Sequence, residues 1–174
     1  MRVTDKYVYF WGEWPSNFAS AEFVTRFNGK EYNFYNSEQY FMFVKAMTFG
    51  DEKIAAQILK EGIDPKRAKS LGRKVSNFND EKWSKIRYKV MVKANMCKYT
   101  QNEHLKKYLL NPEYDGKHFV EASNFDIVWG IGVNEYDAKD DQSNWLGQNL
   151  LGKCLDEVRE RIKNGETDGK KNVE

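Results

Sequence analysis

The stretch EFVTRFNGKEYNFYNSEQYFMFVKA, residues 22–46, predicts a β-hairpin followed directly by an α-helix. Two strand-like runs flank Asn28-Gly29, the residue pair that best tolerates the positive φ angles of a type I′ turn. Asn36 then suits a helix N-cap, with Gln39 three residues later as in a capping box. Apolar side chains follow at the i, i+3, i+4, i+7 spacing of a helix. This segment favours a fold that mixes strands and helices.

The rest of the chain adds mainly helices. Further elements are expected as strands at 7–11 and about 118–123, and as helices at 51–60, 65–71, 80–98, 103–110 and from near Trp145. Gly72 is expected as the C′ glycine that closes the helix at 65–71. Together they predict an α+β fold, a mostly helical single domain with a small antiparallel sheet built from the hairpin and the segment after Lys117. The domain is expected over residues 1–163, and residues 164–174 are expected to form a flexible tail because they have little to bury.

Composition excludes several classes of protein. The 174 residues carry 28 Lys+Arg against 26 Asp+Glu, a net charge of +2, so nothing favours binding of nucleic acid by overall charge. Aromatic residues make up 15% of the chain and are expected to build much of the core. No stretch approaches the roughly 20 apolar residues that a membrane span requires, and no signal peptide is recognisable. A cytoplasmic protein without membrane association is the expectation.

The cysteines and histidines argue against a metal or redox site. Cys97 and Cys154 lie far apart with no CxxC spacing, and His104 and His118 are the only histidines. This is too few ligands for a zinc site. Two buried thiols in a reducing cytosol, with no metal and no cofactor, are therefore expected.

One charged stripe lies among aromatic residues on the first helix. Glu38, Phe41 and Lys45 follow at steps of three and four residues, so they share one helix face. The adjoining face is apolar, which favours partial burial of Lys45. Burial lowers the pKa of a lysine and makes its amine a nucleophile. The alternative is that Lys45 extends to water and Glu38 favours the positive N-terminal end of the helix.

Arg87 poses the same question on the long helix. At about 100° per residue it falls near the centre of the apolar stripe that contains Trp83 and Met91. An arginine in that position should meet a carboxylate or a phosphate. A buried ion pair with Glu38 or Glu121 and contact with a ligand are both open.

Two carboxylates follow each other in the segment HFVEASNFD. Alternation places Phe119, Glu121 and Ser123 on one face of a strand, and Asp126 follows shortly beyond. Two acids beside an aromatic side chain suit general acid and base roles. Acidic residues also cap turns and pair with arginines in many domains, so both interpretations stay open.

The glycines near the C-terminal end do not predict a dinucleotide site. WGIG, residues 129–132, lacks the third glycine of that motif. The backbone at Gly130 suits either close approach of a ligand or a bend in an apolar strand. Asn144 suits the N-cap of the last helix, and Gly147 and Gly152 within that helix indicate close packing.

Six motifs in order resemble one known family. They are FWGEWPSNF (10–18), YNSEQYFMFVKA (35–46), AKSLGRKV (68–75), the W-x-x-x-R of Trp83 and Arg87, FVEASNFDIVWGIG (119–132) and NWLGQNLLGK (144–153). This set is similar to the NADAR domain family, also called YbiA-like. The resemblance implies an α+β fold and hydrolysis of N-glycosidic bonds.

The resemblance also implies substrates and site residues. Family substrates are ribosylamino-pyrimidine phosphates, which are early intermediates of riboflavin synthesis, or guanine that carries ADP-ribose in DNA or RNA. Both join a 5′-phosphorylated ribose to a nitrogen of a guanine-derived ring. Carried over by position, the catalytic residues are Glu38, Lys45, Glu121 and Asp126, and the substrate-binding residues are Asn17, Arg73, Arg87, Trp129, Gly130 and Asn144.

Two chemical routes and one other function class remain open. Glu121 or Asp126 can act by acid/base hydrolysis, or the Lys45 amine can capture C1′ as a Schiff base. In either route Trp129 would stack on the base, and Arg73, Arg87 or Asn17 would hold phosphate and hydroxyls. The alternative class is a non-catalytic module that binds nucleotide, ADP-ribose or nucleic acid through stacking aromatics.

Overall fold

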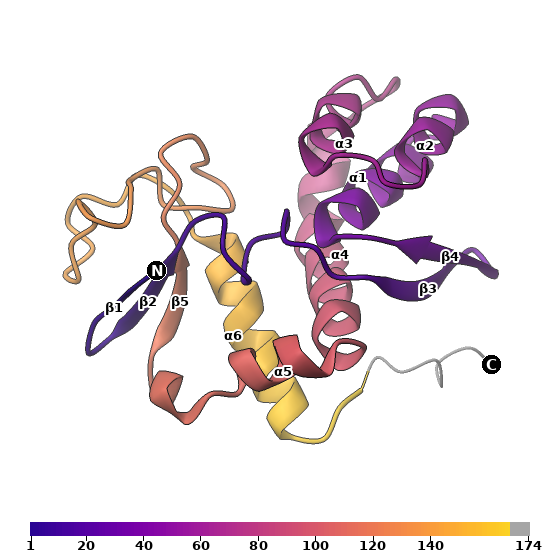
Figure 1. Ribbon diagram of the computed structural model, residues 1–174. Coiled ribbons are helices and arrows are strands. Elements are labelled where there is room, and N and C mark those ends of the chain that lie inside the picture. The colour runs from indigo at the N-terminus through magenta and orange to yellow at the C-terminus, as the bar shows by residue number, and fades with distance from the viewer. Residues whose placement is uncertain (168–174) are drawn as a thin grey trace. The chain divides into compact units, whose positions relative to one another are not determined.

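The computed structural model describes residues 1–167 of the chain. These residues contain two short sheets and six α-helices, joined by irregular segments (Figure 1). This composition confirms the predicted α+β class. The residues gather into two compact units. Unit 1 comprises residues 1–16 and 103–166, and unit 2 comprises residues 17–102.

Unit 2 begins with the predicted hairpin. Strands β3 (Phe23–Phe27) and β4 (Lys30–Phe34) pair antiparallel, with Phe23 opposite Phe34. Asn28 and Gly29 have φ angles of 50° and 79°. Both positive angles are those that a type I′ turn requires, so the predicted turn is confirmed.

Helix α1 (Ser37–Thr48) follows the hairpin and begins as predicted. The Asn36 side chain accepts a hydrogen bond from the Gln39 backbone N–H at 2.8 Å. The Gln39 side-chain oxygen accepts from the Tyr35 N–H, one residue before the N-cap, and its amide donates to the Ile58 carbonyl. One buried glutamine therefore joins the hairpin, α1 and the end of the next helix.

Three more helices complete unit 2, each with a side-chain cap from Asp51, Asp64 or Asn79: α2 (Glu52–Ile58), α3 (Pro65–Gly72) and α4 (Asp80–Thr100). Gly72 was expected just beyond the end of α3, but it is the last residue of that helix. A Cβ atom on Gly72 would lie 1.9 Å from the Met42 sulfur. The missing side chain at Gly72 therefore makes room for the Met42 side chain of α1, and the glycine does not supply a left-handed backbone.

Unit 1 contains a three-stranded sheet in the order β1 (Arg2–Val3), β2 (Tyr7–Phe10), β5 (His118–Glu121). β1 is antiparallel to β2, whereas β5 is parallel to β2. The expectation that the hairpin and the segment after Lys117 share one antiparallel sheet is wrong. The hairpin strands pair only with each other. More than one hundred residues separate β2 from β5, which leaves ample chain for a parallel crossover.

The remaining elements of unit 1 are α5 (Glu103–Leu109), a 3₁₀ turn (Pro112–Tyr114) and α6 (Leu150–Lys163). α6 begins five residues after the predicted start at Trp145. Residues 122–149 form neither helix nor strand. The buried face of α6, formed by Leu151, Leu155 and Val158, packs on β5.

Between residues 1 and 167, no helix is both long and apolar enough to cross a membrane. The two cysteines are buried and form no disulfide, as expected. The predicted tail at 164–174 falls largely on residues 168–174, which lie outside the described part of the chain.

Candidate active site

Helix α1 presents Glu38 and Lys45 on one face, as the sequence predicts. Glu38 is buried, and Lys45 lies two turns later and is half-buried. The Lys45 Nζ atom lies 4.5 Å from the centroid of the Phe78 ring. A cation over an aromatic face is attracted to the ring, and the contact shields one side of the amine from water.

The charged neighbours of Lys45 act in opposite directions on its pKa. Burial is the largest influence and lowers the pKa of the Lys45 amine. The Glu38 carboxylate raises this pKa, Arg73 lowers it, and Asp80 raises it more weakly. The net pKa lies below that of an ordinary lysine, so a larger fraction of the amine is unprotonated and nucleophilic near neutral pH.

Arg73, which acts electrostatically on Lys45, follows the glycine at the end of α3. The missing side chain of Gly72 lets α3 approach Met42 on α1. Arg73 follows immediately as the exposed C-cap residue of α3. The predicted residues Glu38, Lys45 and Arg73 thus lie close enough within unit 2 to influence one another electrostatically.

Asn17 holds the start of α1. Its backbone carbonyl accepts the Glu38 N–H at 3.0 Å, and its buried side-chain oxygen accepts from the Asn95 amide at 3.5 Å. Asn17 therefore fixes the backbone that carries Glu38.

Arg87 is half-exposed on α4, whereas Trp83, Met91 and Ala94 are buried. Counted at about 100° per residue, Arg87 lies between Trp83 and Met91 on the helix surface, and its side chain is only partly withdrawn from water.

In unit 1, Glu121 ends strand β5 and is half-buried. Its backbone N–H donates to the Asn149 side-chain oxygen at 3.0 Å, and its carbonyl accepts from the Ile131 N–H at 3.0 Å. Both backbone groups are thus fixed, which limits the directions that the carboxylate can take. Phe119 and Val120 point to opposite faces of strand β5, and both are fully buried. The strand therefore has no solvent-exposed face at these two positions.

Asp126 forms a tight turn that leads into Trp129. Its Oδ1 atom accepts the N–H groups of Val128 at 2.9 Å and Trp129 at 2.8 Å. This is an Asx-type turn, in which an aspartate replaces a backbone acceptor. Asp126 therefore has the structural role of holding this turn through Oδ1.

Gly130 joins these residues. A Cβ atom on Gly130 would lie 2.9 Å from the Glu121 carbonyl oxygen and 3.0 Å from the Asp126 carbonyl oxygen. Unit 1 thus brings together Glu121, Asp126, Trp129 and Gly130. The space that a side chain would fill at Gly130 holds the protein's own backbone, so the glycine serves packing there.

Asn144 is not the N-cap of α6. Its side-chain oxygen accepts the Lys139 N–H at 3.0 Å, and its amide donates to the Asp137 carbonyl at 2.7 Å. It stabilises a loop. The residue before α6 is Asn149, which the motif contained but which helix periodicity did not single out.

The sequence also gave no reason to select Phe78 and Asp80. Phe78 precedes the Asn79 cap, and Asp80 is the first residue of α4. Aspartate in a first helical turn is usual, so only the three-dimensional approach of α4 to α1 reveals that both act on Lys45.

Among residues 1–167, no group of three or more His, Cys, Asp and Glu side chains is placed to hold a metal ion.

Comparison with protein families gives a match to the NADAR domain over residues 1–163. The chain belongs to the NADAR domain family. The family assignment made from the six motifs is therefore confirmed.

Curated relatives of this NADAR protein include several N-glycosidases. Protein irg-1 of Caenorhabditis elegans is 44% identical over 129 residues, which cover 72% of this chain and 59% of that protein. An N-glycosidase of Acanthamoeba polyphaga mimivirus is 39% identical over 167 residues, covering 90% of this chain and 96% of that protein. N-glycosidase YbiA of Escherichia coli is 31% identical over 147 residues, covering 84% and 79% respectively.

A solved structure supports the NADAR fold. The NMR structure of Escherichia coli YbiA matches with a TM-score of 0.69 at 28% identity, covering 94% of this chain and 89% of that chain. The α+β fold predicted from the sequence is the fold of this neighbour.

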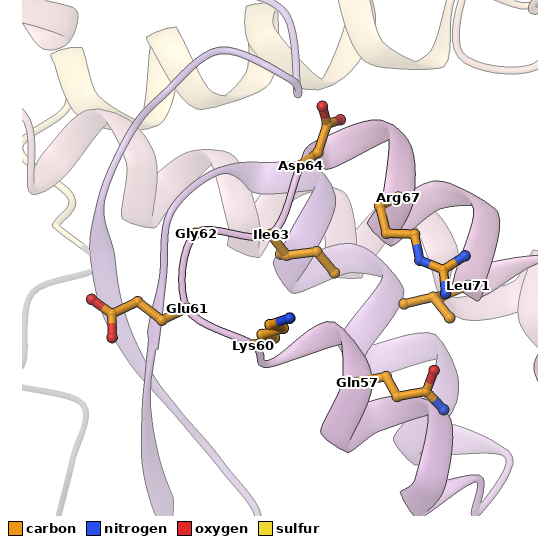
Figure 2. Close-up of a pocket in the computed structure, with 8 residues that line it drawn as sticks. All are labelled: Gln57, Lys60, Glu61, Gly62, Ile63, Asp64, Arg67 and Leu71. Carbon is orange, nitrogen blue, oxygen red and sulfur yellow. The ribbon is translucent and has the colours of Figure 1, made fainter.

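Two cavities in this NADAR protein are lined by other residues than those predicted for the site. Figure 2 shows the one in unit 2, about 430 Å³, at the connection between α2 and α3. The carboxylates of Glu61 and Asp64 point away from the Arg67 guanidinium there. The other, about 690 Å³, lies in unit 1 and is lined by residues that include His118, Trp145 and Asn149.

Proposed function

We propose that the protein hydrolyses the C1′–N bond between a 5′-phosphorylated ribose and a guanine-derived base. The names of the mimiviral and bacterial relatives support N-glycosidase activity in general. The observation that carries the proposal is the state of the Lys45 amine. Burial lowers its pKa, and the charges of Glu38, Arg73 and Asp80 act on it as well. A binding module that only stacks on bases has no need for such an amine.

The covalent route uses Lys45 as the nucleophile. The Lys45 nitrogen attacks C1′, the C1′–N bond to the base breaks, and the base leaves with a proton. The sugar ring opens as C1′ becomes an imine with Lys45, and the ring oxygen takes up a proton. Water then adds to the imine, releases the sugar phosphate as an aldehyde and regenerates the amine. Glu38 is suited to carry the protons, and Arg73 to hold a phosphate.

The rival route needs only acid/base chemistry. Cleavage of the C1′–N bond builds positive charge on the sugar, which a nearby carboxylate stabilises, and the departing nitrogen needs a proton. Asp126 Oδ2 or the Glu121 carboxylate would take these roles within unit 1. Trp129, directly after the Asp126 turn, would stack on the base.

Two substrates fit the proposed chemistry. One is a ribosylamino-pyrimidine phosphate, and the other is ADP-ribosylated guanine in DNA or RNA. Both present a 5′-phosphorylated ribose with nitrogen on C1′.

Incubation of the protein with each substrate, followed by mass spectrometry of the products, tests the proposal. Cleavage releases the free base from the pyrimidine substrate, and free ADP-ribose from the modified DNA or RNA, in which the guanine remains. Release from at least one substrate supports it, and the substrate that reacts names the class. Measurable binding of both substrates without release from either would overturn it in favour of a binding module.

A further inference from the structure

Asn149 occupies an unusual position for a helix N-cap. It directly precedes α6 and has φ 54° and ψ 42°, the left-handed region that asparagine tolerates better than most residues. An asparagine at this position normally uses its side chain to cap the first helical N–H groups. Among the described residues of α6, none receives a capping hydrogen bond from the Asn149 side chain. Asn149 is only 7% exposed, and its side chain forms hydrogen bonds to another element of unit 1.

The Asn149 side chain binds strand β5. Its Oδ1 accepts the Glu121 N–H at 3.0 Å, and its Nδ2 donates to the Phe119 carbonyl at 3.0 Å. These two groups flank Val120, whose own backbone faces β2 through the parallel pairing. The carboxamide thus replaces one residue of a neighbouring strand at the free edge of β5.

The Asn149 backbone binds the loop that carries Trp129. Its N–H donates to the Gly130 carbonyl at 3.1 Å. The amides on either side continue the pattern, in which Gln148, Leu150 and Leu151 donate to the carbonyls of Ile127, Val128 and Trp129 respectively. One residue therefore holds β5 through its side chain and the loop 127–131 through its backbone.

Gly152 leaves room for this arrangement. A Cβ atom there would lie 2.0 Å from the Phe119 carbonyl oxygen and 2.4 Å from the Asn149 amide nitrogen. The Asn149 carboxamide thus occupies the space that a side chain at position 152 would need.

We propose that Asn149 is a positioning residue, which fixes the Glu121 backbone relative to the turn that carries Asp126 and Trp129. The effect on catalysis rests on the proposed function, in which Glu121 or Asp126 takes part in the chemistry. The positioning itself does not depend on it, because the hydrogen bonds of Asn149 can be observed without substrate.

Asn149→Gly tests the proposal, because glycine accepts the left-handed backbone but has no carboxamide. Exposed Asn77, with φ 58°, supplies the control Asn77→Gly. Val158→Ala, a cavity in the face of α6 that packs on β5, supplies a variant that is destabilised but keeps the Asn149 carboxamide and its two hydrogen bonds to β5.

Two readouts are measured at a temperature where every variant is folded. Backbone amide exchange by NMR is expected to show faster exchange at Glu121 in Asn149→Gly alone. The kcat is expected to fall on the order of 100-fold in Asn149→Gly, with KM changed much less, since misplacement of a reacting group by about 1 Å has that effect. Both controls are expected to keep kcat within about twofold.

Unchanged Glu121 exchange in Asn149→Gly would overturn the proposal. An equal loss of kcat in Val158→Ala would also overturn it, because general destabilisation would then explain the effect. If the wild-type protein cleaves neither substrate, the proposed function fails, but Glu121 exchange still decides whether Asn149 holds the strand.

Discussion

The two units carry their candidate residues in different ways. In unit 2, Glu38, Lys45 and Arg73 lie on or at the end of helices that side-chain caps define. In unit 1, Asp126, Trp129 and Gly130 lie in residues 122–149, which have no regular secondary structure. The first set is held by helix packing, and the second by individual backbone hydrogen bonds.

This difference determines how each unit should respond to mutation. A helix tolerates the loss of one side chain because its own ladder of hydrogen bonds remains. An irregular loop depends on a few specific donors and acceptors, and each loss leaves a buried group unpaired. We therefore expect functional effects to dominate in unit 2 and structural effects to dominate in unit 1.

The largest functional effect is expected in unit 2, from Lys45→Ala. Loss of the nucleophile should lower kcat roughly 1,000-fold or more, about 4 kcal/mol in activation free energy, while the fold is retained. Steady-state kinetics and a thermal melt measure the two effects. Lys53→Ala, at an exposed lysine of α2, is the control and should behave as wild type. Activity within tenfold of wild type in Lys45→Ala would remove Lys45 from the reaction.

The largest structural effect is expected in unit 1, from Gly152→Ala. The new Cβ would lie 2.0 Å from the backbone oxygen of Phe119, which cannot move without disturbing β5. We expect a loss of about 3 kcal/mol or more in the free energy of unfolding, measured by urea denaturation. Gly72→Ala is the matched variant in unit 2, where the clash is with the flexible Met42 side chain. An equal cost for the two variants would contradict the comparison.

Part of this architecture could be predicted from the sequence. Caps, turn residues and the 3.6-residue period are local signals, and they located the hairpin, α1 and the Glu38–Lys45 face. The parallel pairing of β2 with β5 and the role of Asn149 depend on residues more than twenty-five positions apart, so no local pattern contains them. Gly72 was assigned to the wrong task because glycine at a helix end suits both a turn and a close approach.

Two substitutions of Asp126 distinguish its structural role in unit 1 from a chemical role. Asp126→Asn keeps an oxygen that can accept from Val128 and Trp129, whereas Asp126→Ala loses both hydrogen bonds. We expect Asp126→Ala to lose about 1–2 kcal/mol of stability and Asp126→Asn to lose less, by urea denaturation. In the acid/base route Asp126→Asn lowers kcat on the order of 100-fold. A fully active Asp126→Asn would show that the turn is the only task of this residue.

The smallest effects are expected on the pH profile. Arg73 lowers the pKa of Lys45 and Asp80 raises it. Activity that needs the unprotonated amine rises as Lys45 loses its proton, so Arg73→Gln should move the rise in kcat/KM to higher pH and Asp80→Asn to lower pH. Shifts in the same direction would contradict this assignment of charges.

The stability of the protein should follow the same pKa. The folded pKa of Lys45 lies below the unfolded value, so between the two the unfolded chain binds more protons. Stability therefore rises with pH through that window. Lys45→Met should flatten this rise, as measured by urea denaturation at a series of alkaline pH values. An unchanged slope would show that Lys45 is not the group that titrates there.

Borohydride trapping during turnover tests most directly whether Lys45 carries the reaction. The reagent reduces an imine to a stable amine, so the sugar phosphate should remain attached to the peptide that contains Lys45 and be seen by mass spectrometry. We predict this adduct in the wild-type protein with whichever substrate is cleaved, and its absence in Lys45→Ala. Continued cleavage by the wild-type protein with no adduct at any lysine would contradict the covalent route.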